Sequence, residues 1–129
     1  MDYDEFVGEV HHRAQFASSG EAVRAIRATL QTLGERLFGN EADHLAAQLP
    51  EEIGTYLTME EQKEAFPLDE FFQRVSDREE VDLPDATYHA RVVIEVIEEA
   101  VTGNELDDVR AQLPAGYAPL FEAGSEGDM

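Results

Sequence analysis

The residues with the clearest potential for chemistry are a glutamate and a histidine three positions apart, Glu41 and His44. On a helix this spacing places both side chains on one face, which is the arrangement used by carboxylate-bridged metal sites in helical bundles. A second pair with the same spacing, Glu105 and Asp108, lies further along the chain. These four residues are therefore the candidate ligands of a metal ion.

The same acids also have a purely structural interpretation, which the sequence favours. Glu41 and Glu105 each follow an asparagine at the expected start of a helix, where an acidic side chain stabilises the helix dipole. His44 lies beside the inward stripe of its helix, not on it. The sequence therefore predicts no metal, no cofactor and no catalytic residue. If a metal site were present, Glu35 and Glu99 would be its additional ligands.

Two arginines occupy corresponding positions in the two halves of the chain, Arg27 and Arg91. Because arginine makes bidentate contacts with carboxylates, we expect structural ion pairs to neighbouring helices, with an anion-binding site as the alternative. Asp85 and His89, four residues apart, could form a base and the group that orients it. Their simpler interpretation is a pair on the surface of a helix.

Charge is the strongest feature of the composition, since 29 acidic residues face 9 basic ones and the formal net charge is -20. Such a field repels phosphate backbones and anionic lipids, so neither nucleic acid nor membrane is an expected partner. Salt screens this repulsion, and we therefore expect a protein adapted to a salt-rich cytoplasm. A more specific alternative is an acidic decoy that binds basic proteins.

The chain has no cysteine, which excludes a disulfide framework, a thiolate metal site and a cysteine nucleophile. Its N-terminal residues are acidic and lack the basic and apolar regions of a secretory signal. No apolar stretch approaches the length needed to span a membrane. These features predict a cytoplasmic protein.

A shift of 64 positions aligns the chain with itself. It superimposes Gly39-Asn40-Glu41 on Gly103-Asn104-Glu105, and Ala47-Gln48-Leu49-Pro50 on Ala111-Gln112-Leu113-Pro114. Self-similarity at a fixed offset is the signature of a repeated structural unit. The sequence therefore predicts a duplication, with repeats at residues 1–58 and 66–121 and a mobile acidic tail at 122–129.

Each repeat has the apolar spacing of amphipathic helices. Ser18, three residues before Glu21, is a capping box that marks one helix start. The segment 92–97 is β-branched enough to resemble a strand, but it aligns with residues 28–33 inside a longer amphipathic run. We therefore predict an all-α fold with three longer helices and a short one per repeat, packed as one compact bundle.

One apolar stripe distinguishes the second repeat from the first, and it consists of His89, Val92, Val96 and Ala100. A helix that is apolar around most of its circumference is normally buried, so the stripe is expected to pack inside the protein. The alternative is an interaction surface for a homodimer or an unknown protein partner.

The chain resembles an uncharacterised prokaryotic family, domain of unknown function 2267. The resemblance rests on Met1-Asp2-Tyr3-Asp4-Glu5-Phe6, the segment 29–37, the doubled Gln-Leu-Pro and Leu68-Asp69-Glu70-Phe71, and it extends to Phe121. It implies a duplicated helical domain and supplies no activity or catalytic residues. The expected function is thus a non-catalytic helical interaction module, with a metal-dependent carboxylate/histidine enzyme as the alternative.

Overall fold

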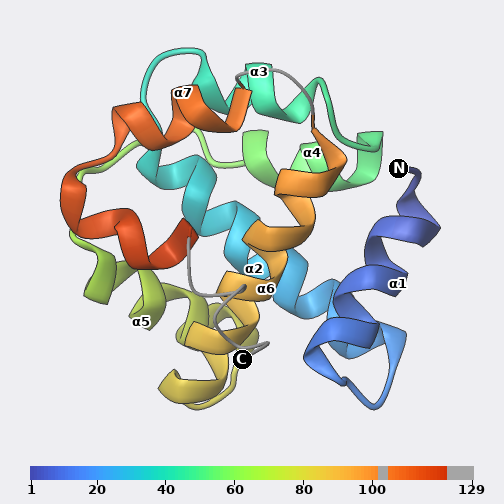
Figure 1. Ribbon diagram of the computed structural model, residues 1–129. Helices are drawn as coiled ribbons and strands as arrows, with labels where there is room; N and C mark the ends of the chain where they lie inside the picture. Colours follow the sequence, from blue (N-terminus) through green and yellow to red (C-terminus); the bar gives the residue numbers. More distant parts are fainter. Residues whose placement is uncertain (102–104, 122–129) are drawn as a thin grey trace.

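The computed structural model describes residues 1–101 and 105–121, and within these ranges every regular element is a helix (Figure 1). The predicted all-α fold is therefore confirmed, while the predicted tail at 122–129 lies outside the described residues. None of the described helices is long and apolar enough to cross a membrane. The helices are α1 (Tyr3–Ala14), α2 (Ser19–Arg36), α3 (Glu41–Ala46), α4 (Glu51–Thr58), α5 (Leu68–Glu79), α6 (Leu83–Ala100), α7 (Glu105–Gln112) and the 3-10 turn η1 (Ala115–Tyr117).

The helix starts follow from their local sequence. The predicted capping box is confirmed, because the Ser18 side chain accepts a hydrogen bond from the backbone of Glu21 while the Glu21 carboxylate accepts one from Ser18. Asp2 and Glu5 form the same reciprocal pair at the start of α1. Asp82 occupies the N-cap position of α6, and Pro84 supplies the fixed backbone angle that suits the first turn.

The two longest helices, α2 and α6, lie against each other at the centre of the molecule. Each of the helices α1 and α5 packs on both of them, and α4 packs on α2. The short helices α3 and α7 contact each other at one end of the bundle, at the top of Figure 1. The segment 92–97 lies inside α6, so its predicted helical conformation is confirmed.

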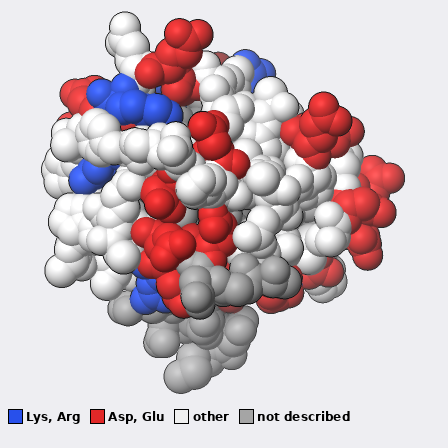
Figure 2. Space-filling model, turned by 90° about the horizontal axis from the view of Figure 1, so that it is seen from above, with Lys and Arg blue, Asp and Glu red and all other residues white. Residues whose placement is uncertain are grey.

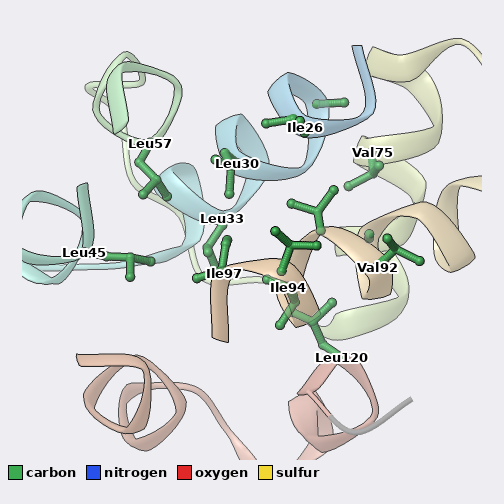
Figure 3. Packing of buried hydrophobic residues seen from close by; sticks show 14 of the residues in the cluster. Ile26, Leu30, Leu33, Leu45, Leu57, Val75, Val92, Ile94, Ile97 and Leu120 are labelled. Atoms are coloured by element: carbon green, nitrogen blue, oxygen red, sulfur yellow. The ribbon is translucent and has the colours of Figure 1, made fainter. Parts of the chain in front are cut away.

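Facing residues of the two central helices form the middle of the core, to which each of the other described helices also contributes buried side chains. Ile26, Leu30 and Leu33 of α2 lie opposite Ile94 and Ile97 of α6, and all five are fully buried (Figure 3). Fully burying one such side chain contributes about 1.5–3 kcal/mol relative to leaving it exposed. The contact between α2 and α6 is therefore a main source of the protein's stability.

The apolar stripe of the second half belongs to this interior. Val96 is fully buried and Val92 is 3 % exposed. Ala100 is partly buried against the core, and the side chain of His89 is 12 % exposed. The chain itself therefore covers Val92 and Val96, which leaves neither side chain available to a partner in this structure.

The segment between α4 and α5 is bound along the C-terminal end of α2. Lys63 donates to the carbonyl oxygen of Gly34 at 2.7 Å, and the backbone N–H of Glu64 donates to that of Glu35 at 2.9 Å. The carbonyl of Phe66 accepts hydrogen bonds from Arg36 and from the Tyr117 hydroxyl. The bonds from Lys63 and Glu64 satisfy carbonyl groups that the C-terminal end of α2 leaves unpaired, and those to Phe66 attach the segment itself.

Ion pairs join the outer helices to the central ones. Arg13 of α1 contacts Glu95 and Glu99 of α6 at 3.1 and 2.6 Å. On the other side, Glu35 of α2 contacts Arg74 and Arg78 of α5 at 2.9 and 3.2 Å. Burial opposes ionisation of Glu35, but hydrogen bonds from Arg78 and Arg74 outweigh it and hold the pKa of this carboxyl below its ordinary value.

Replacing Glu35 by glutamine should lower the free energy of unfolding by roughly 1–2 kcal/mol at neutral pH, because it removes the one carboxylate that pairs with Arg78 among the described residues and one of those that pair with Arg74. A carboxyl with a lowered pKa in the folded state stabilises the protein above its ordinary pKa, and this contribution disappears as the pH falls through the folded value. The difference between wild type and Glu35→Gln in urea unfolding should therefore shrink from pH 7 toward pH 3.

Glu61→Gln is the matched control for this measurement, since Glu61 is exposed and the charge change is identical. It should change the unfolding free energy by no more than about 0.5 kcal/mol at any pH. A difference between wild type and Glu35→Gln that stays constant with pH would contradict the assignment.

Candidate metal centre

Three of the four candidate metal ligands come together where α3 meets α7. One ligand atom from each of Glu41, His44 and Glu105 lies within 4.8 Å of the other two. Glu41 and Glu105 are the first residues of α3 and α7, and His44 lies one turn after Glu41. The cluster therefore combines residues that are far apart in the sequence.

The chain around α3 and α7 fixes the positions of these side chains. Gly39 has a φ of +68°, a left-handed conformation that suits glycine, and it turns the chain between α2 and α3. The side-chain amide of Gln112, at the end of α7, accepts a hydrogen bond from the N–H of Phe38 and donates one to its carbonyl. These two bonds attach α7 to the segment that leads into α3.

Both carboxylates of the cluster carry a buried oxygen that has no hydrogen-bond partner in the part of the chain that the structure describes. Oε2 of Glu41 and Oε1 of Glu105 are inaccessible to solvent and accept no hydrogen bond from the described residues. The closest donor atom in the cluster, Nδ1 of His44, lies 3.9 Å from Oε1 of Glu105, which is too far for a hydrogen bond. A buried oxygen of an ionised carboxylate is costly unless a cation or a donor compensates it.

Further acidic side chains surround this end of the molecule. Figure 2 looks onto the end that carries α3 and α7, and acidic residues form a band across the middle of that face. The resulting negative potential raises the local concentration of cations. The cluster therefore lies where a divalent ion would be attracted.

Two carboxylates and one imidazole are a donor set typical of zinc and of other divalent transition metals. Bonds of about 2.1 Å to each ligand would bring the donor atoms to roughly 3.4 Å from one another in a tetrahedral site. The three donor atoms lie within 4.8 Å of one another, so each pair would have to approach by up to about 1.4 Å to hold an ion. The side chain of His44 is 60 % exposed, so part of the coordination sphere would face water.

The other sequence candidates for this centre lie elsewhere. Asp108 is exposed and does not belong to the cluster. Glu35 is engaged by Arg74 and Arg78, and Glu99 by Arg13, so neither is available as an additional ligand.

Within residues 1–101 and 105–121 neither Arg27 nor Arg91 forms an ion pair, so the structural ion pairs expected for them stay a prediction. Arg91 lies over the ring of Phe72, with its guanidinium carbon 5.7 Å from the ring centre. Arg27 is exposed and lines a surface hollow. The internal alignment of the sequence identified these two positions as equivalent. It could not identify which side chains of neighbouring helices lie opposite each arginine.

His89 also has a different partner from the one its spacing suggested. Its Nδ1 lies 2.5 Å from Oε2 of Glu79, while Asp85 only lines the same cavity of about 340 Å³. The Glu79 side chain is 3 % exposed and its Oε1 has no hydrogen-bond partner in the described structure. No sequence pattern indicated this pair, because its two residues are ten positions apart and belong to different helices.

These observations define a class of protein, namely a small all-helical protein with a carboxylate and histidine cluster at one end. The chain belongs to the family of uncharacterized conserved proteins DUF2267, whose family model matches residues 3–120. The resemblance read from the sequence is thereby confirmed. A search of curated proteins found no match.

Proposed function

We propose that this protein is a non-catalytic helical interaction module whose α3–α7 end binds one divalent transition-metal ion. The observation that carries the proposal is the convergence of Glu41, His44 and Glu105, two of which hold a buried carboxylate oxygen that no described residue hydrogen-bonds. A bound ion would compensate both oxygens at once. It would also join α3 to α7 and so stiffen the acidic face that a partner would contact.

We further propose that the chain arose by duplication. The ion would then lie where two equivalent segments of the repeats meet. The helices α1 and α5 both have 12 residues, and α2 and α6 both have 18. Arg13 and Glu99 are paired across the two halves, and so are Arg78 and Glu35 at the corresponding positions. The same correspondence relates Glu41 to Glu105.

The test is calorimetric titration of untagged protein with Zn²⁺, Mn²⁺ and Mg²⁺. One ion of Zn²⁺ or Mn²⁺ should bind per chain, and more tightly than Mg²⁺, because imidazole is a poor ligand for the harder ion. Glu41→Gln and Glu105→Gln should each weaken the binding of Zn²⁺ at least tenfold, since each removes a direct ligand. Similar losses in these two variants are expected if the two positions are equivalent.

The control variant is Asp108→Asn, which removes the same charge from the same helix one turn away from Glu105. It should leave the affinity for Zn²⁺ within about twofold of the wild-type value, because a single exposed charge acts only through a screened field. Equal losses in Asp108→Asn and Glu105→Gln would indicate general attraction by the acidic face, and the proposal of a defined site would then be wrong.

A metal-dependent enzyme is the second candidate, and the exposure of His44 favours it. Three protein ligands with an open side leave room for a metal-bound water, which is the arrangement of catalytic zinc sites. The two functions differ in one measurement. Zinc-loaded protein that hydrolyses an activated ester, with the activity lost in Glu105→Gln, would support the enzyme.

We also propose that the surface is adapted to a salt-rich cytoplasm, for which the net charge of -20 is the support. Self-repulsion at this charge destabilises the compact state, and salt screens it. The thermal midpoint of unfolding should therefore rise as KCl increases from dilute to molar. A midpoint that is constant or falls over this range would remove the support for this proposal.

A further inference from the structure

Almost every basic side chain in this acidic protein is engaged by a neighbour. Arginines and the lysine pair with glutamates, donate to carbonyl groups or lie over aromatic rings, and the residues concerned are Arg13, Arg36, Lys63, Arg74, Arg78, Arg91 and Arg110. Arg24 and Arg27 have no such partner among the described residues. Although the chain has 29 acidic residues, these two exposed arginines form no ion pair, hydrogen bond or ring contact within the described part of the chain.

Arg24 and Arg27 both line one surface hollow, and Arg24 also borders the neighbouring cavity that holds His89. They lie three residues apart on α2, and this spacing places their side chains on one face of the helix. The hollow has a volume of about 380 Å³, and Ala28 and Gln31 of the same helix contribute to its wall. This volume is within the range typical of pockets that bind small organic ligands.

A third arginine, Arg78 at the end of α5, completes the hollow and is held in place from behind. It donates to the hydroxyl of Thr32 at 2.9 Å and to Oε2 of Glu35 at 3.2 Å. These bonds restrict its side chain, so less conformational entropy is lost when it contacts a ligand. Glu80 is the one acidic side chain in the wall, so three cations face one anion there.

We propose that this hollow binds a phosphate group, either free or as the monoester of a small molecule. The planar guanidinium group matches the geometry of phosphate oxygens and contacts them in a bidentate manner. A doubly charged phosphate balances the two unpaired arginines, which a single carboxylate does not. The site is separate from the metal centre, because residues of α2 and α5 and Glu80 line it and no residue of α3 or α7 does. In Figure 1, α3 and α7 lie together at the top of the molecule.

The experiment is a titration of the isotopically labelled full chain, followed by NMR of the arginine Nε–Hε signals at constant ionic strength. The probes are inorganic phosphate, glycerol 2-phosphate and acetate. The signals of Arg24 and Arg27 should shift with both phosphate compounds and respond at least tenfold more weakly to acetate. Tighter binding of inorganic phosphate would identify the ligand as free phosphate, and tighter binding of glycerol 2-phosphate would identify it as a phosphate monoester. A response to acetate as strong as that to phosphate would overturn the proposal.

Arg27→Gln should weaken phosphate binding about tenfold, since it removes one charge-assisted contact. Arg110→Gln is the matched control, because Arg110 is also exposed and lies on α7, outside the hollow. Its affinity for phosphate should remain within about twofold of the wild-type value. Equal weakening in the two variants would indicate a general effect of net charge and would overturn the proposal. Unchanged thermal midpoints would show that both variants remain folded.

Discussion

Replacing Val96 by aspartate should abolish the cooperative fold of the monomer. Val96 is fully buried on α6, which packs against α1, α2 and α5. An unpaired carboxylate at this position would cost at least about 3–5 kcal/mol, a large part of the 5–15 kcal/mol by which a domain of this size is usually stable. Urea unfolding followed by circular dichroism should therefore show a lost or strongly shifted transition.

The matched control is Val96→Thr, and the first half of the chain provides its precedent. Thr32, at the corresponding position of α2, is fully buried and donates its hydroxyl to the carbonyl of Ala28 at 2.8 Å. A threonine at position 96 can satisfy its hydroxyl in the same way, so the expected loss is below about 2 kcal/mol. If Val96→Asp kept the wild-type midpoint and changed only the sedimentation mass, the side chain would belong to an external surface and the assigned packing would be wrong.

The helical state of the segment around Val96 was predictable from the sequence, although its residues favour strands. Local β-propensity is weak, and the apolar spacing of the whole 18-residue helix outweighs it. Ser18 was equally informative, because a capping box is a local feature whose two partners are three residues apart. The positions of helices could therefore be predicted wherever they depend on interactions between residues that are close in the sequence.

Contacts between helices that are far apart in the sequence could not be predicted in this way. The apolar stripe of α6 could be recognised, but its burial depends on how α1, α2 and α5 are placed around it. Likewise, the sequence identified Arg27 and Glu35 as notable charges. It did not reveal that Glu35 forms an ion pair with Arg78, or that Arg27 has no carboxylate partner in the described structure. Such pairings depend on which helix faces meet.

The candidate metal centre illustrates both cases. The spacing of Glu41 and His44 was sufficient to place them on one face of α3, and they do contribute to one cluster. The same spacing suggested Glu105 and Asp108 as an equivalent pair, but α7 brings only its first residue, Glu105, to the contact with α3. The approach of α7 to α3 depends on contacts such as that of Gln112 with Phe38, which join residues 74 positions apart.

Gly34→Ala should cause a second large loss of stability, of about 2–4 kcal/mol. In most helix interiors this change is favourable, because alanine has a higher helix propensity than glycine. In α2, however, an added Cβ at position 34 would lie 2.0 Å from the carbonyl oxygen of Leu57 in α4. The obstacle is backbone, so relief would require α4 to move away from α2 and would expose part of the core.

Gly8→Ala tests whether this loss arises from the contact and not from the substitution itself. Gly8 also lies inside a helix, α1, but apart from its chain neighbours and the backbone of its own helix no described atom lies within 4 Å of an added Cβ there. This variant should gain about 0.5–1 kcal/mol in the free energy of unfolding, measured by urea denaturation under the same conditions. The two identical substitutions should thus have effects of opposite sign. A Gly34→Ala variant as stable as Gly8→Ala would contradict the close approach of α4 to α2 on which this part of the core depends.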